Sequence, residues 1–311
     1  QWVHLGLTVN RTTGTARIYL NGIDKTSDTS VRTDFATAGV LNVGRMGTSG
    51  LYLAGHLDDF RLYNRVLSSG DLDQLRLLCE NPVQHWRFNS STATSAPNGS
   101  AVTLSASGAT YNTTDSQEGA AALDFNGAGY ATAPNSDLGN AFAIATWVKV
   151  TSGTNTLETI AANSNGGTDT AGWRFIATGS THATPGRLIL ESGNGTAGSG
   201  IKIQTANNAI TYNTWNHVGA TLDKTRGLSR IYVNGVDQTP SGTARTDFTT
   251  TGVLQIGRTA DNANLLNGSL DDLRIHPRWL GESEIRVLAV GKLLAHWRFD
   301  STGTDESGFG R

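Results

Sequence analysis

The sequence contains almost no cysteine and no long hydrophobic run. Cys79 is the single cysteine among 311 residues, so no disulfide can form within the chain. No stretch reaches the roughly 18 apolar residues of a transmembrane helix. The formal net charge is only −2, from 24 Lys and Arg against 26 Asp and Glu. This balance gives the chain no attraction to nucleic acid or to an anionic membrane, and we expect neither as a partner.

Glycine is abundant instead, with 37 residues, and Thr, Ser and Asn are frequent. Such a composition is typical of many short strands joined by tight turns. Segment 141–150, AFAIATWVKV, alternates with period two as a strand does, and Asn126-Gly127 predicts a hairpin turn between two strand-like segments. Helical patterns occur only at 69–78 and 282–290. Without βαβ alternation, the pattern predicts an all-β protein, a two-sheet antiparallel sandwich or jelly roll.

The sequence also repeats itself, which is the feature that organises the domains. The matching pairs include Trp2 with Trp215, Asn21-Gly22 with Asn234-Gly235, Asp58-Asp59 with Asp271-Asp272, and His85-Trp86 with His296-Trp297. We therefore expect tandem repeats: residues 1–80 as the C-terminal half of one domain, 84–291 as a complete domain, and 293–311 as the first strand of a further repeat. Half a sandwich would expose an apolar face. The expectation is a window on a longer array, with the missing halves outside it or on a neighbouring chain.

The repeated Asp-Asp pair carries the sharpest chemical signal. In a regular strand, Asp271 shares a face with Leu273 and Ile275, whereas Asp272 shares the other face with Arg274. A carboxylate on the apolar side needs a partner, a cage of hydrogen bonds or a metal ion. The alternating pattern predicts that Asp272 and Arg274 form an ordinary surface pair, worth at most about 1 kcal/mol. These residues indicate a structural site more than a reaction.

Several blocks of the sequence resemble one family. LDFNGAGYATAPNS, AFAIATWVKV, TWNHVGATLD, SRIYVNGVD, GVLQIGR and GSLDDLRIHPRWLGESEI follow one another across 84–291 as in the laminin-G-like, concanavalin A-like jelly rolls of bacterial extracellular proteins. The resemblance implies two curved antiparallel sheets, an extracellular or cell-surface location and, in many members, a structural Ca²⁺. Members bind glycans, bind proteins or act as spacers, so the fold alone does not select a function.

The resemblance also implies where calcium would bind: at the first Asp of the LDD motif and at oxygens near the first strand. The candidate ligands are Asp271 and Asp58 from the motif, Asn89 and Asn98 near the first strand of the complete domain, and Asp300 and Asp305 near that of the further repeat. Ca²⁺ takes six to eight oxygen ligands, and Asn supplies less charge than Asp. The alternative is an Asp271 carboxylate that accepts hydrogen bonds from backbone N–H groups.

No sequence pattern indicates catalysis. A retaining glycosidase needs two carboxylates about 5–5.5 Å apart, and Glu191 stands alone near the end of its strand. A glycan platform would need exposed aromatic rings with amide or carboxylate neighbours, and the candidates are Trp173, Trp279, Tyr130 and Tyr212. We therefore expect a non-enzymatic module of a surface or secreted adhesin that binds glycan or extracellular protein ligands. The alternative is a building block of an extracellular fibre, sheath or stalk, held by contacts between neighbouring repeats or chains.

Overall fold

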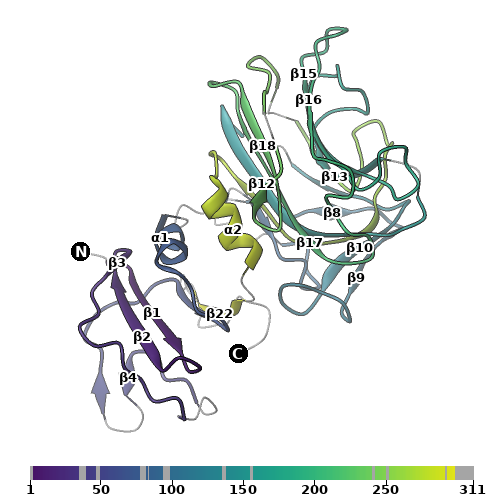
Figure 1. The fold of residues 1–311 in the computed structure, drawn as a ribbon. Helices are drawn as coiled ribbons and strands as arrows, with labels where there is room; N and C mark the ends of the chain where they lie inside the picture. The colour runs from purple at the N-terminus through teal and green to yellow at the C-terminus, as the bar shows by residue number, and fades with distance from the viewer. Residues whose placement is uncertain are drawn as a thin grey trace. The chain divides into compact units, whose positions relative to one another are not determined.

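The computed structural model divides the chain into two compact units, Glu80–Val290 and Gln1–Cys79 with Gly291–Arg311, here named unit 2 and unit 1 (Figure 1). Antiparallel strands dominate both units, as the sequence predicted. No helix among the described residues is long and apolar enough to cross a membrane. The structure describes residues 3–34, 40–46, 50–77, 82, 84–93, 99–134, 138–154, 157–239, 242–249, 252–290 and 293–297.

Unit 2 is a sandwich of two sheets. Sheet I has the strand order β19-β18-β17-β12-β21-β10-β9, with β7 also paired to β21. Its strands are β7 (Gln84–Trp86), β9 (Ala109–Asn112), β10 (Ala122–Asn126), β12 (Ala141–Val150), β17 (Asn216–Asp223), β18 (Leu228–Val233), β19 (Val236–Asp237) and β21 (Asn267–His276). Sheet II has the order β16-β15-β14-β13-β20-β11-β8. Its strands are β8 (Thr103–Leu104), β11 (Ala131–Ala133), β13 (Leu157–Ala162), β14 (Gly172–Thr178), β15 (Leu188–Gly193), β16 (Ile201–Gln204) and β20 (Leu254–Ile256).

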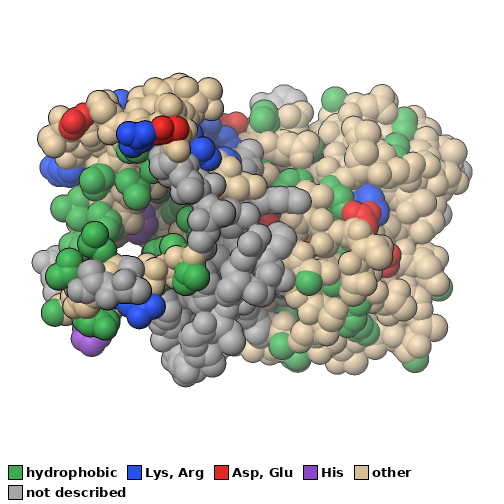
Figure 2. Space-filling view, turned by 90° about the horizontal axis from the view of Figure 1, so that it is seen from below, with side chains coloured by type: hydrophobic (Ala, Val, Ile, Leu, Met, Phe, Trp, Pro, Cys, Tyr) green, Lys and Arg blue, Asp and Glu red, His purple; other side chains and the backbone are tan. Residues whose placement is uncertain are grey.

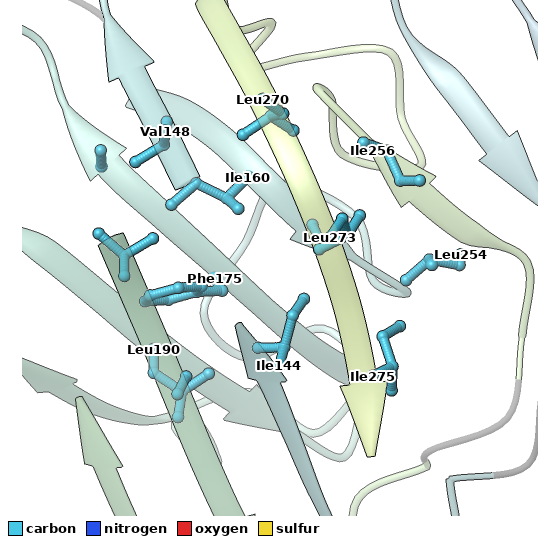
Figure 3. Packing of buried hydrophobic residues seen from close by; sticks show 14 of the residues in the cluster. Ile144, Val148, Ile160, Phe175, Leu190, Leu254, Ile256, Leu270, Leu273 and Ile275 are labelled. Atoms are coloured by element: carbon cyan, nitrogen blue, oxygen red, sulfur yellow. The ribbon is translucent and has the colours of Figure 1, made fainter. Parts of the chain in front are cut away.

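The hydrophobic core of unit 2 lies between these two sheets (Figure 3). Sheet I contributes the inward side chains of β12 and β21, such as Ile144 and Leu273, both fully buried. Sheet II contributes those of β14 and β15, such as Phe175 and Leu190. The alternation of β12 places Phe142, Ile144, Val148 and Val150 in the core, which fits its position at the centre of sheet I.

Helix α2 (Glu282–Val290) packs on the outer face of sheet I. A Cβ added at Gly219 would lie 3.2 Å from a methyl carbon of Ile285, so glycine permits this close approach. The Glu284 side chain caps the helix by accepting the Gly281 N–H at 2.9 Å. Both predicted helices are confirmed.

Unit 1 repeats part of this arrangement with fewer strands. Its elements are β1 (Leu5–Asn10), β2 (Thr15–Leu20), β3 (Ile23–Asp24), β4 (Arg45–Met46), β5 (Leu51–Tyr52), β6 (Phe60–Tyr63), α1 (Ser69–Leu77) and β22 (Leu293–Trp297). Strands β1, β2 and β3 form a three-stranded sheet, whereas β4 pairs with β5 and β6 with β22. At the start of α1, Ser68 and Asp71 form the reciprocal hydrogen bonds of a capping box, at 3.0 and 3.1 Å.

Strand β22 occupies in unit 1 the position that β7 occupies in unit 2. His296 lies opposite Arg61, as His85 lies opposite Arg274. The sequence repeat aligns these residues with each other. The strand that follows unit 2 in the sequence therefore pairs with a strand from the beginning of the chain, in the register used within unit 2.

The hairpin predicted at Asn126-Gly127 is wrong. β10 pairs with β9 and β21 in sheet I, whereas β11 pairs with β8 and β20 in sheet II. The chain therefore crosses from one sheet to the other at this turn. Gly127, with φ of 79°, still adopts the left-handed conformation that a tight turn requires. The turn chemistry was interpreted correctly, but not the pairing of the strands on either side.

Candidate functional site

The Asp-Asp strand is not regular, because β21 contains a bulge. Opposite β12, Ala145 pairs with Arg274 and Trp147 pairs with Asp271, so β21 has one more residue between these pairs than β12 has. Asp272 adopts the left-handed conformation with φ of 52°, which Asp tolerates better than most residues. The bulge interrupts the alternation, and both carboxylates of the pair become buried.

Asp271 accepts hydrogen bonds from the loop that precedes β10. Its Oδ2 receives the backbone N–H groups of Gln117 and Glu118, both at 2.8 Å, whereas its Oδ1 is buried with no hydrogen-bond partner. Burial raises the pKa of Asp271 to about 8, against the lowering effect of these N–H donors. The sequence left open whether Asp271 binds calcium or accepts hydrogen bonds from backbone N–H groups. The structure shows these hydrogen bonds.

Glu118 lies in the same buried region and was not singled out from the sequence. Burial, together with the negative charge of Asp272, raises the pKa of Glu118 to about 9. Glu118 lies in a loop far from Asp271 in the sequence, so only the fold brings them together. Glu118 and Asp271 are thus two buried carboxyl groups, each with a raised pKa.

Asp272 corrects the expectation of a surface pair. Its side chain is only 5% exposed; it accepts the Nε2–H of His85 at 2.6 Å and lies 2.8 Å from a guanidinium nitrogen of Arg274. Burial opposes ionisation, but the charge of Arg274 and the His85 contact hold the pKa of Asp272 well below its usual range. Burial also lowers the pKa of His85, so a neutral imidazole donates this hydrogen bond. The bulge, which a strict alternation ignores, is the reason for the difference.

The remaining predicted metal ligands lie in different environments. Asn89 Oδ1 accepts the N–H groups of Ala120 and Ala121 at 2.9 and 3.3 Å. This oxygen is therefore bonded to the same loop that carries Glu118. Asp58 is exposed in unit 1. Asn98, Asp300 and Asp305 lie outside the described residues. Within the described part of the chain, no three His, Cys, Asp or Glu side chains gather as a metal site.

Two of the predicted glycan platforms lie inside the sandwich or against its core. Trp173 is fully buried, with its ring centroid 5.0 Å from that of Phe142, so the prediction that it stacks on a sugar is wrong. The inward face of β14 carries it into the core. Tyr212 is partly buried against the core, and its hydroxyl donates to the Thr178 carbonyl at 2.8 Å. This hydrogen bond gives Tyr212 a structural role.

Tyr130 has a different setting: it is partly exposed and immediately precedes β11. The Cζ atom of Arg258 lies 3.3 Å from the centroid of the Tyr130 ring, a stacked cation–π contact. The Arg258 Nε donates to the Gln255 amide oxygen at 2.8 Å, and its Nη1 hydrogen-bonds the Asn262 amide oxygen. This group combines an aromatic ring, a planar cation and two amides. Neither Arg258 nor these amides were singled out from the sequence.

The loop that carries Asn262 is held in one conformation by its own hydrogen bonds. Asn262 has a left-handed φ of 61°, and its N–H donates to the Thr259 carbonyl at 3.1 Å. Asp261 accepts the N–H of Gly166 at 3.0 Å, which joins this loop to the loop that follows β13. The polar groups around Tyr130 are therefore largely positioned before any ligand binds.

Trp279 is half-buried, and Arg226 covers one face of its ring, with Cζ 4.9 Å from the ring centroid. Arg226 is in turn paired with Asp223, whose Oδ2 accepts the Arg226 Nε–H at 2.7 Å. The equivalent position in unit 1 is Val66, so this arrangement belongs to unit 2 alone. Trp279 has charged neighbours but none of the amides that surround Tyr130.

The raised pKa values of Glu118 and Asp271 should make the melting temperature of unit 2 depend on pH. A carboxyl group whose pKa is higher in the folded state contributes stability below its unfolded pKa and loses it as pH rises through the folded value. For Glu118 and Asp271 these limits are 4.5 and 3.8 when unfolded, and about 9 and about 8 when folded. We expect the melting temperature of unit 2 to fall by several degrees between neutral pH and pH 9, and Glu118→Gln to flatten this fall. An equal fall in the variant would contradict the assignment.

The fold and this geometry define an antiparallel jelly-roll sandwich with a polar site at its surface and a buried carboxyl pair. The sequence matches the family model described as the concanavalin A-like lectin/glucanases superfamily over residues 1–73 and 125–286. The chain belongs to this superfamily. Among curated proteins, no relative matches the sequence.

Solved structures with a similar fold include domain 4 of AbnA, a GH43 extracellular arabinanase from Geobacillus stearothermophilus, in complex with arabinotriose. It is 20% identical over 67% of this chain and 98% of that one, with a TM-score of 0.49. The binding domain of botulinum neurotoxin serotype G is 16% identical over 67% of this chain and 50% of that one, with a TM-score of 0.50. The binding domain of botulinum neurotoxin serotype D/C is 16% identical over 67% of this chain and 51% of that one, with a TM-score of 0.50. The chain thus spans about half the length of the neurotoxin domains, and this similarity shows the fold alone.

Proposed function

We propose that unit 2 is a non-enzymatic carbohydrate-binding module of a surface or secreted adhesin, with Tyr130 as its sugar platform. The observation that carries the proposal is the stacked pair of Tyr130 and Arg258, with the amides of Gln255 and Asn262 hydrogen-bonded to the guanidinium. The C–H groups of a sugar can stack on the face of an aromatic ring, and amide and guanidinium groups can hydrogen-bond its hydroxyl groups. Membership of a lectin and glucanase superfamily supports the same class of ligand.

Three buried carboxyl groups, those of Glu191, Asp271 and Glu118, are placed for a structural role and not for hydrolysis. Glu191 is paired with Arg174, and both side chains are about 5% exposed or less. Asp271 is fully buried, and Glu118 is 8% exposed, so a glycosidic bond could not reach between them. A glycosidase would need both carboxyl groups beside the substrate.

The experiment is an oligosaccharide array probed with the full chain, followed by titration of the best neutral or acidic oligosaccharide. We expect Tyr130→Ala to weaken binding about tenfold or more, since loss of a central aromatic contact commonly costs over about 1 kcal/mol. Tyr130→Phe keeps the ring and should bind within about twofold. Trp279→Ala tests the other candidate, the half-buried Trp279. An array without any binding, or an affinity lost only in Trp279→Ala, would contradict the proposed site.

A structural calcium ion is the second part of the proposal, and the ligands proposed for it differ from the set predicted from the sequence. Asp271, with its unpartnered Oδ1, and Glu118 would hold the ion, whereas the Asn89 oxygen accepts backbone N–H groups. When bound, the ion supplies positive charge that favours the ionised carboxylates. Millimolar Ca²⁺ should therefore raise the melting temperature of unit 2 most at pH 9 and abolish its alkaline fall. EGTA should restore the alkaline fall of the melting temperature, and Glu118→Gln should remove the effect of Ca²⁺. A melting temperature that Ca²⁺ leaves unchanged at every pH would contradict the proposed calcium site.

One observation favours the alternative function, a building block of an extracellular fibre, sheath or stalk. β22 pairs with β6 in the register that β7 and β21 use within unit 2. A strand from one part of the sequence can thus complete a sheet formed by another. Repeats or chains linked in this way would be held together by main-chain hydrogen bonds.

A further inference from the structure

Unit 1 exposes large apolar side chains along one set of strands. Leu7 is 66% exposed, Leu5 69% and Ile18 48%, although all three belong to a regular antiparallel pair. Figure 2 shows hydrophobic side chains gathered at the surface of unit 1, while polar groups and backbone cover most of the visible surface of unit 2. A contiguous exposed apolar patch of this kind marks an interaction surface.

The sequence repeat shows which residues of unit 2 correspond to this apolar patch of unit 1. The equivalent positions in unit 2 are core residues, each no more than 7% exposed. The pairs are Leu5 and Val218, Leu7 and Ala220, Ile18 and Ile231, Leu20 and Val233, Leu41 and Leu254, Val43 and Ile256, Leu57 and Leu270, and Leu62 and Ile275. We name the eight unit 1 members of these pairs the open face. Each has a counterpart that lies in the sandwich core.

Other exposed residues of unit 1 show that the pattern is specific. Ile23 is 60% exposed and its counterpart Val236 is 52% exposed; Val40 is 86% exposed and its counterpart Val253 is 50% exposed. Exposure therefore does not differ between the units at every apolar position. It does differ at the open face, whose counterparts lie in the core of unit 2.

In unit 2 most of the cover comes from strands that precede β17 in the sequence, whereas β20, which holds Leu254 and Ile256, follows it. β11, β13, β14 and β15 of sheet II bring Ala131, Ile160, Phe175 and Leu190 against the inner face of sheet I. These strands lie within residues 99–213. In unit 1, β22 pairs with β6 at the position that β7 occupies beside β21 in unit 2. Unit 1 thus accepts one strand of a jelly roll and presents the face on which the remaining strands would pack.

We propose that the open face is a docking surface for the first half of another jelly roll, a polypeptide segment with the strand pattern of residues 99–213. The segment would pack its apolar face on Leu7, Ile18 and Leu62, as sheet II packs on Ala220, Ile231 and Ile275 in unit 2. Such a partner belongs to the same family as this chain, and the contact makes one complete sandwich from two segments. The inference is independent of glycan binding.

The test supplies the segment in a defined position. Residues 99–213 are fused directly ahead of Gln1 in the full chain, so that the added segment precedes Trp2 as residues 99–213 precede the corresponding Trp215. The fluorescence of anilinonaphthalene sulfonate, which reports exposed apolar surface, should fall by about threefold or more relative to the unfused chain. A second cooperative unfolding transition should appear. Unchanged fluorescence with a single transition would overturn the proposal.

Matched substitutions separate docking on the open face from a general effect of fusion. Leu7→Asp with Ile18→Asp in the fused protein should restore the dye signal, because these positions would be buried. Ile23→Asp with Val40→Asp should leave the signal low, because their counterparts stay exposed in unit 2. Equal effects of both pairs would overturn the proposal. So would a doubling of the mass of the unfused chain that Leu7→Asp abolishes, since a second copy would then cover the face.

Discussion

Replacing Asp272 with alanine is expected to lower the free energy of unfolding of unit 2 by about 3–5 kcal/mol, as removal of one partner of a buried ion pair does. The change leaves His85 without its acceptor and Arg274 without its counter-ion in a site where the Asp272 side chain is 5% exposed. It also removes a residue that tolerates the left-handed backbone of the bulge. Both effects act on β21, which pairs with β12 and β10 inside sheet I.

The chain contains its own control for this prediction. In unit 1, Asp59 has the same left-handed conformation, with φ of 52°, and pairs with Arg61 at 2.9 Å. The Asp59 side chain is 31% exposed, so Asp59→Ala should cost about 1 kcal/mol or less through the ion pair. Chemical denaturation of both variants, followed by Trp fluorescence, gives the two values. Equal losses would show that burial of the Asp272 network does not determine its contribution.

Local patterns in the sequence predicted the architecture well. The two helices and the alternating strand at 141–150 follow from spacing within a few residues. The long-range features could not be predicted in this way. Glu118 contacts Asp271 only because the loop before β10 folds onto β21, and no local pattern indicates that contact.

The errors have physical reasons. Trp173 was predicted as a sugar platform because it is aromatic, and the sequence does not show which face of its strand the other sheet covers. Asp272 was placed on the surface because alternation assumes a regular strand, and a single extra residue at a bulge reverses the faces beyond it. In the candidate glycan site, Tyr130 was predicted, but its partner Arg258 comes from a neighbouring strand end and required the pairing of β11 with β20.

The same sequence pattern therefore forms a covered sheet in unit 2 and an open face in unit 1. Strands β17 and β18 pair Ala220 with Ile231, and β1 and β2 pair Leu7 with Ile18 in the equivalent register. The hydrogen-bond ladder is the same in both units. What differs is that β17 also pairs with β12 and is covered by sheet II, whereas within the described residues β1 pairs with β2 alone.

Amide hydrogen exchange of the full chain, resolved for β1 and β17, tests this difference most directly. Exchange in β17 should require opening of the whole sandwich, whereas β1 should exchange by local opening. Because a global stability of about 5 kcal/mol or more slows exchange over a thousandfold, we expect the β17 amides to exchange about a thousand times more slowly than their β1 counterparts. Equal protection of the two strands would contradict the account, because it would mean that the open face is already covered.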